Sequence, residues 1–144
     1  MSYSEQHRFA MQLAQLSRGW RAELDRRLAG LGLSQARWLV LLHLARFQEL
    51  PTQRELAQSV GVEGPTLARL LDSLEAQGLV RRQAVAEDRR AKKISLSAEA
   101  RPLIEQIEAI STQLRLELFA GLDEEELRCC QRVHARILAN LEKP

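Results

Sequence analysis

The sequence has little of the material from which several common kinds of functional site are built. Aromatic residues make up 4% of its 144 residues, too few for the stacked rings that bind RNA or single-stranded DNA. Glycine (7) and proline (4) are scarce, so most of the chain should lie in helices and strands. No glycine-rich phosphate loop, nucleophile elbow or metal motif is present, which predicts a protein that is not an enzyme and needs no cofactor.

Cysteine and long apolar runs are also nearly missing. The two cysteines, Cys129 and Cys130, are adjacent, a spacing typical of neither a disulfide framework nor a metal site. The three histidines lie far apart, so no zinc site built from sequence-local ligands is predicted. No run of eighteen apolar residues and no leader-like start is found, and we therefore expect a cytoplasmic protein that does not contact a membrane.

What the sequence does contain is a local concentration of positive charge. The net charge is only +2, but residues 79–93 include six Arg and Lys residues and two acidic ones. A short basic segment of this kind is what a phosphate-binding surface needs.

Just before this basic segment, the pattern predicts two short helices joined by a tight turn. Thr52-Gln53-Arg54-Glu55 is a capping box that opens the first helix, and Gly61 ends it. Gly64-Pro65 opens the second helix, because proline suits a first helical turn, and Gly78 ends it. The second helix has a leucine stripe at Leu67, Leu70, Leu71 and Leu74. This arrangement is typical of a helix-turn-helix.

Beyond Gly78 the pattern changes to strand-like segments at 79–83 and 93–96, with a polar stretch between them. This predicts a β-hairpin with a basic tip, known as a wing. Amphipathic helices are expected at 4–29 and from 97 onwards, and Ser34 and Asp123 are expected to cap two others. The fold class is therefore mainly α with a small β-hairpin. We expect a winged helix-turn-helix core at 34–97, an N-terminal dimerisation helix at 1–33 and C-terminal dimerisation helices at 98–144.

The second helix of the predicted motif has the side chains needed to read duplex DNA. With its leucines facing inward, Thr66, Arg69 and Ser73 share the exposed face, and a helix fits the major groove, where base edges are distinguishable. The free amides near Gly64 and Pro65 at its start favour a phosphate. In the hairpin, Asp88-Arg89-Arg90 could place an arginine in the minor groove while the carboxylate orients it, with Lys92 adding positive charge.

The segment from Gly61 to Leu96 resembles the MarR family of bacterial transcription regulators, closest to its SlyA-type members. The motifs that carry the resemblance are Gly61-Val62-Glu63, Thr66 to Glu75, Gly78-Leu79-Val80 and Asp88 to Leu96. The family's wing has an Asp, one residue, an Arg, and later Leu-Thr; this chain has Ser97 in place of the threonine. We interpret that change as mild, because serine also caps the helix that follows.

The resemblance implies roles for residues and partners. Arg69 would be the recognition-helix arginine and Arg90 the minor-groove arginine, oriented by Asp88. It also implies a homodimer, held by the terminal helices, that regulates transcription from pseudo-palindromic double-stranded DNA. Small aromatic carboxylates bind between the dimerisation and DNA-binding parts of similar proteins. The candidate lining here is Arg18, Trp20, Trp38 and His43, although Trp38 and His43 are more typical of core residues.

Two alternatives remain open from the sequence. The flanking Arg128 and Arg132 could activate Cys129 or Cys130 for thiol-based redox sensing, although Cys130 lies in an apolar stripe and packing is the more usual role. The second alternative is a winged-helix module that binds proteins. Such a module would not need a basic wing, and its binding would lack the salt dependence of DNA binding.

Overall fold

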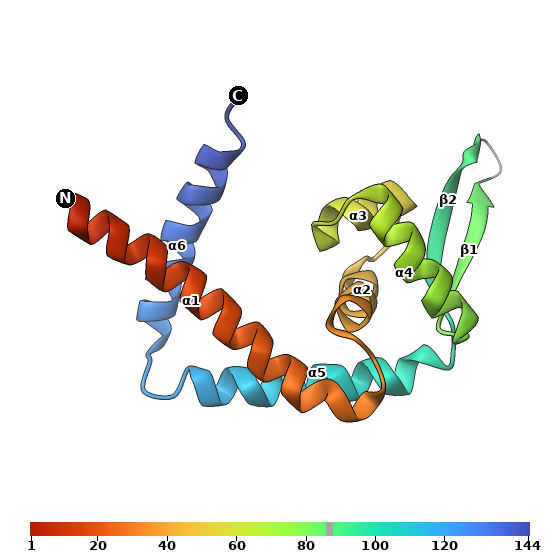
Figure 1. The fold of residues 1–144 in the computed structure, drawn as a ribbon, viewed down its shortest axis with the longest axis horizontal. Helices are drawn as coiled ribbons and strands as arrows, with labels where there is room; N and C mark the ends of the chain where they lie inside the picture. The colour runs from red at the N-terminus through yellow and green to blue at the C-terminus, as the bar shows by residue number, and fades with distance from the viewer. Residues whose placement is uncertain (86–87) are drawn as a thin grey trace. The chain divides into compact units, whose positions relative to one another are not determined.

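The computed structural model describes the backbone of residues 1–85 and 88–144 and the side chains of residues 1–85 and 91–144. It divides into two compact units, Met1–Thr112 and Gln113–Pro144. In chain order, shown in Figure 1, the helices and strands are α1 (Tyr3–Leu28), η1 (Ala29–Leu31), α2 (Gln35–Arg46), α3 (Gln53–Val60), α4 (Gly64–Ala76), β1 (Val80–Val85), β2 (Asp88–Leu96), α5 (Ala100–Leu118) and α6 (Glu124–Leu141). The predicted fold class, mainly helical with a β-hairpin wing and long terminal helices, is confirmed.

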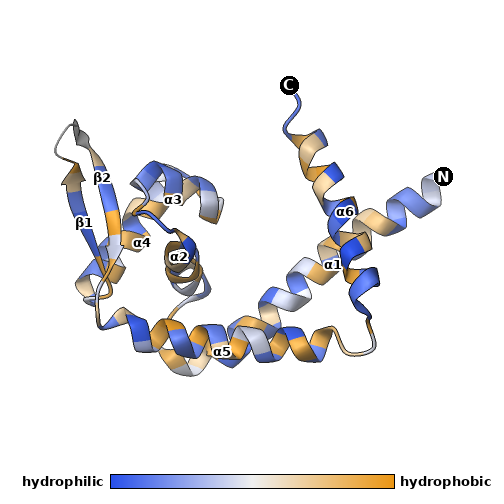
Figure 2. Ribbon diagram, turned by 180° about the vertical axis from the view of Figure 1, so that it is seen from behind, coloured by the Kyte–Doolittle hydropathy of each residue, from blue (hydrophilic) through white to orange (hydrophobic). Residues whose placement is uncertain are grey.

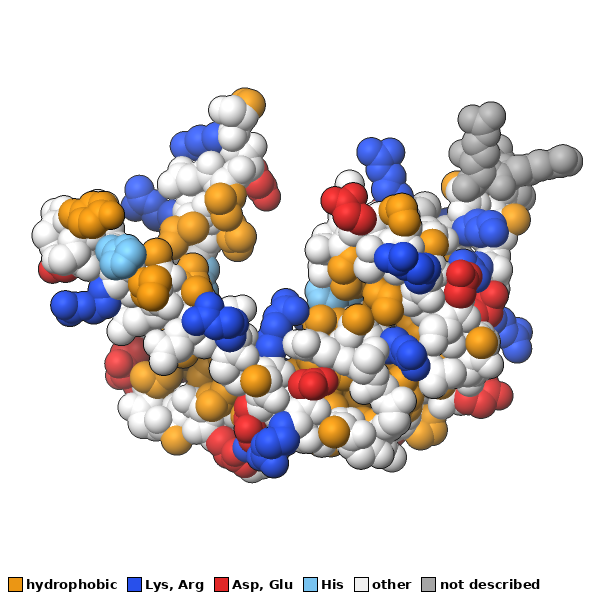
Figure 3. Space-filling model, in the orientation of Figure 1, with side chains coloured by type: hydrophobic (Ala, Val, Ile, Leu, Met, Phe, Trp, Pro, Cys, Tyr) orange, Lys and Arg blue, Asp and Glu red, His pale blue; other side chains and the backbone are white. Residues whose placement is uncertain are grey.

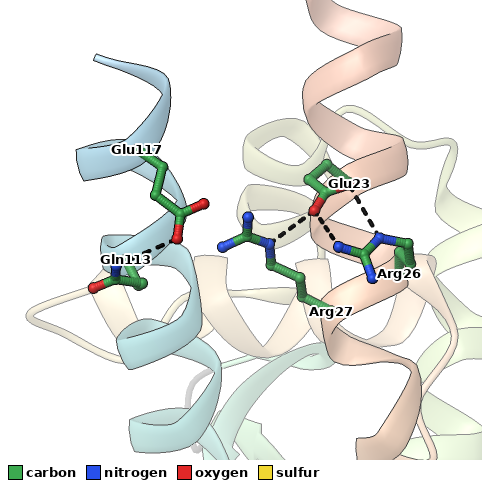
Figure 4. A network of polar contacts seen from close by, with 5 residues as sticks. All are labelled: Glu23, Arg26, Arg27, Gln113 and Glu117. Carbon is green, nitrogen blue, oxygen red and sulfur yellow. Dashed lines mark hydrogen bonds and ion pairs between the residues drawn. The ribbon is translucent and has the colours of Figure 1, made fainter. Parts of the chain in front are cut away.

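Helix α1 begins and ends with polar interactions that are local in sequence. Ser2 and Glu5 form a capping box at its start, and Glu23 receives hydrogen bonds from Arg26 and Arg27 near its end (Figure 4). These two guanidinium groups lower the pKa of Glu23 to about 2. The helix then tightens into η1, and Gly32 takes the left-handed conformation with φ 72°. Glycine adopts this conformation without the steric cost that other residues meet.

The core of the first unit is built around α2. Trp38, Val40 and Leu41 are at most 1% exposed, and this helix is apolar on most of its sides, so it is covered from several directions. Helices α3 and α4 contribute Leu56, Leu67, Leu71 and Leu74, all 0% exposed. The expected capping box of α3, Thr52 with Glu55, is present. Gly61 ends α3 with φ 82°, as predicted.

The hairpin is the predicted wing, and it is antiparallel. The register pairs Val80 with Leu96 and Ala84 with Lys92, with an irregularity between Ala84 and Val85. Its base is fastened to two other segments. Thr52 bridges Lys93, the Ile94 amide donates to the Pro51 carbonyl at 3.0 Å, and the Ser97 hydroxyl donates to the Gly78 carbonyl at 2.6 Å.

The contact made by Ser97 differs from the expected helix cap. Helix α5 begins three residues later, at Ala100, and the Ser97 hydroxyl closes the hairpin instead. Helix α5 is amphipathic, as expected, over most of its length. Ile104, Ile107 and Leu114 are buried, whereas Leu118 is 46% exposed.

The second unit contains the end of α5 and all of α6. Gln113 donates to Glu117 one turn further along α5 (Figure 4). Asp123 caps α6 in a capping box with Glu126, as the sequence predicted. No residue of α6 is buried, and Val133, Leu138 and Leu141 are 40%, 58% and 75% exposed.

Among the described residues, no single helix has the length and apolar character needed to cross a membrane. In this part of the chain, one pair of helices, Tyr3–Leu31 and Gln35–Arg46, bent by 92°, meets that length and composition together.

Candidate nucleic-acid interface

Helix α4 presents a polar face away from its buried leucines. Arg69 is exposed, and Thr66 and Ser73 are half-buried. Because these residues are spaced by three and four positions, they lie next to one another along one side of the helix. The structure therefore brings together the three side chains that the sequence placed on the reading face.

The first turn of α4 is open to an incoming anion. Gly64 and Pro65 are exposed, and the N-cap residue Glu63 makes no side-chain hydrogen bond to the helix amides. Amides at the start of a helix, together with the helix dipole, favour a phosphate group. This end of α4 therefore has the exposed amides that a phosphate group needs.

A hollow of about 680 Å³ lies where α3, α4 and the hairpin meet. Its polar lining includes Gln53, Arg54 and Gln58 from α3 and Lys92 from β2. Figure 3 shows basic side chains over this region with acidic ones among them. From the sequence, Lys92 is a predicted binding residue and the three α3 residues are not, although their position in the first helix of the motif was a usable signal.

Arg82 holds α4 and the hairpin together. Its guanidinium pairs with Asp72 and, at 3.3 Å, with Glu75, and its amide donates to Glu75 at 3.2 Å. The hydrogen bonds from Arg82 lower the pKa of Glu75, and the two carboxylates raise that of Arg82. The Arg82 side chain is 17% exposed. Sequence reasoning counted Arg82 among the basic residues of the wing, but its charge is balanced within the protein.

The side chains of the proposed wing-tip contacts lie outside the described residues. The backbone of Asp88, Arg89 and Arg90 belongs to β2, in agreement with a place on the wing. Lys92 is described and exposed.

The four candidate effector-binding residues have different environments. Arg18 is exposed and Trp20 is half-buried. Trp38 is 1% exposed, so its ring is a core side chain, and its Nε1 has no hydrogen-bond partner among the described residues. His43 is half-buried and its Nδ1 lies 2.8 Å from the Ser59 hydroxyl, joining α2 to α3. Burial, with the charges of Arg46 and Arg21, lowers the pKa of His43.

The cysteine pair lies on the surface of α6 within the single chain. Cys129 and Cys130 are both exposed, so the chain itself does not supply the packing expected for Cys130. The neighbouring Arg128 and Arg132 pair at 3.0 Å with Glu124 and Glu125, which offsets the positive charge that would activate a thiol. Among the side chains that the structure describes, no three from His, Cys, Asp or Glu are placed to hold a metal ion.

The chain is similar to known proteins in both sequence and fold. A sequence model described as the MarR family matches residues 31–91. The chain is 70% identical to transcriptional regulator PA3341, with a TM-score of 0.88 over 93% of this chain and 98% of that one. It is 25% identical to MepR of S. aureus, with TM-scores of 0.83 to its DNA complex and 0.85 to its DNA-binding conformation. Each of these two alignments covers 93% of this chain and 98% of MepR.

Proposed function

This chain belongs to the MarR family of DNA-binding transcriptional regulators, which are not enzymes, and we propose that it binds pseudo-palindromic duplex DNA as a homodimer. In this proposal Thr66, Arg69 and Ser73 contact the major groove, and Gly64 and Pro65 lie against a phosphate. Arg90, with Arg89, enters the minor groove, Asp88 orients it, and Lys92 binds the backbone.

The observation that carries the proposal is the placement of the reading face of α4. Arg69 is exposed on it and Leu70 of the predicted stripe is half-buried. Leu67, Leu71 and Leu74 are 0% exposed, so the helix cannot rotate to hide Arg69. A long donor on a rigid helix can make bidentate contacts to a guanine edge, the commonest specific contact in the major groove. MepR, a relative with this fold, has been crystallised with DNA.

The homodimer is supported by apolar side chains that the single chain leaves uncovered. On α1, Phe9, Leu13 and Leu16 are 46%, 45% and 65% exposed, and their spacing places them on one side of the helix. Figure 2 shows hydrophobic segments along both α1 and α6. Residues 1–33 and 98–144 would form the dimerisation parts and 34–97 the DNA-binding core. Two recognition helices about 34 Å apart would then reach successive major grooves.

The SlyA-type assignment and the aromatic carboxylate effector are finer parts of the proposal. The effector would bind near Arg18, Trp20 and His43, with Trp38 forming the apolar wall behind them. Because His43 joins α2 to the first helix of the motif, an anion bound beside it would act on the DNA-binding part.

Selection of binding sites from random duplex DNA, at two salt concentrations, tests the proposed function. We expect enrichment of an inverted repeat whose half-sites are one helical turn apart, and an affinity that falls steeply with salt. Salt-sensitive binding without an enriched sequence would contradict sequence-specific reading. Absence of any binding would favour a protein-interaction module. Sedimentation of the protein with the selected DNA then gives the number of chains per site.

A further inference from the structure

The contacts between the recognition helix and the wing present an electrostatic problem. Helix α4 would face DNA phosphates, yet it carries Asp72 and Glu75 and a single basic residue, Arg69. The two carboxylates are 64% and 44% exposed, so they are not hidden in the core. Considered alone, each would repel the DNA backbone.

Arg82 changes the effect of both carboxylates. Its guanidinium extends from β1 and pairs with the two acidic side chains, which are three positions apart on α4. Its backbone amide adds a third link, to Glu75. A planar guanidinium paired with two carboxylates restricts direction as well as distance. Beyond the contacts at the base of the hairpin, these interactions of Arg82 restrain the angle between α4 and β1.

The same angle shapes the surface that receives DNA. The hollow of about 680 Å³ is lined by Ala68 of α4 and by Arg82 and Lys92 of the hairpin. If α4 enters a major groove, the hairpin reaches the neighbouring minor groove only when this angle is correct, since the groove spacing of DNA is fixed.

We propose that Arg82 is a positioning residue for DNA binding: together with Asp72 and Glu75, it fixes the wing relative to the recognition helix and does not itself bind a phosphate. This inference rests on the proposed function. If only the net charge mattered, removing the acidic charges of Asp72 and Glu75 would strengthen DNA binding. The positioning role of Arg82 predicts that it weakens DNA binding.

The test compares two double variants that change the net charge equally. Asp72→Asn with Glu75→Gln breaks the contacts with Arg82. Glu63→Gln with Glu99→Gln removes two acids that line the hollows on either side of Arg82 and leaves those contacts intact. Affinity for the selected site is measured by fluorescence anisotropy at several salt concentrations. We expect about tenfold weaker binding for the first pair, as for loss of a charge-assisted contact, and equal or tighter binding for the control pair.

Arg82→Gln distinguishes positioning from direct phosphate contact. Log affinity falls as log salt concentration rises, and each residue that neutralises a phosphate makes this slope steeper by about 0.9. We expect Arg82→Gln to weaken binding about tenfold without changing the slope. We expect Lys92→Gln to make the slope shallower. Wild-type affinity in Arg82→Gln or in the first double variant would overturn the proposal. A shallower salt dependence in Arg82→Gln would overturn it as well.

Hydrogen exchange of the DNA-free protein provides a readout that does not depend on DNA binding. Amides of residues 80–85 should exchange faster in Arg82→Gln and in the first double variant than in wild type or the control pair. Unchanged exchange would overturn the positioning role even if the wild type failed to bind DNA. Failure of the wild type to bind, with exchange altered as expected, would contradict the proposed function and leave the contacts between α4 and the hairpin established.

Discussion

At the residue scale, the sequence predicted well those properties that depend on the position of a side chain along its own helix. Arg69 is exposed and Leu67 is buried, because helical periodicity alone assigns them to opposite sides. The role of Arg82 could not be found in this way. Its partners Asp72 and Glu75 lie ten and seven positions earlier, on another element, and only tertiary packing brings them together. The positive charge of Arg82, which the sequence alone assigns to the basic wing, is therefore paired within the protein.

Replacement of Arg69 tests the reading face. We expect Arg69→Ala to cost about 1–3 kcal/mol of binding free energy at the best site and to relax discrimination at one base pair. Arg54→Ala is the matched control. Arg54 lines the hollow, and we expect its loss to weaken binding to all sequences about equally, as the loss of a phosphate contact does. Anisotropy measured on a panel of single-base-pair variants separates the two patterns. Equal weakening of all the DNA variants by Arg69→Ala would show that Arg69 does not read a base.

His43 should make stability dependent on pH. Burial, together with Arg46 and Arg21, lowers its pKa below 6.5. Above pH 6.5 the ring is neutral in both the folded and the unfolded states. Below that value the unfolded chain takes up the proton first, so the free energy of unfolding falls. Urea unfolding at pH 7.5 and 5.5 should show a larger loss for wild type than for His43→Gln. Equal losses would mean that the folded state does not disfavour the charged ring.

At the element scale, helix starts were the easiest features to predict. Thr52 with Glu55 and Asp123 with Glu126 form the expected capping boxes, because this motif needs residues only three positions apart. The Ser2–Glu5 box of α1 has the same signal, but the helix was predicted to begin at residue 4, one residue after its observed start. The bridge between Thr52 and Lys93 was not predictable, since it joins segments that are distant in sequence.

The turn between α3 and α4 depends on the backbone of one glycine. Gly61 has φ 82°, and a Cβ added there would meet nothing within 4 Å, so the cost of Gly61→Ala is conformational. We expect a loss of about 1–2 kcal/mol in the free energy of unfolding.

Gly64→Ala is the control for that prediction, because a Cβ there also has open space and the residue is helical. It should leave stability unchanged or raise it by up to about 1 kcal/mol. Chemical unfolding of both variants measures the difference, and equal stabilities would show that the left-handed conformation is not required.

At the scale of the whole molecule, the apolar surface of α1 should be covered by a second chain. Leu16→Glu places a charge on the exposed apolar side of α1, where Leu16 is 65% exposed. We expect the dissociation constant of the dimer to rise at least about tenfold, since a buried unpaired charge is costly, and DNA affinity to fall with it. Gln15→Glu, with the same charge change on a different side of the helix, should do neither. Sedimentation equilibrium measures both variants, and dimers of wild-type strength in Leu16→Glu would place the interface elsewhere.

The closed base of the hairpin has a consequence for evolution and engineering. The Ser97 hydroxyl and amide donate hydrogen bonds to the carbonyls of Gly78 and Leu79 at 2.6 and 3.0 Å, so the two ends of the hairpin lie next to each other. Insertions or exchanges at the far end of such a segment need not displace the helices α4 and α5 that flank it. Hairpin tips should therefore be exchangeable between relatives of this protein, changing which DNA is preferred while the helices before and after keep their structure.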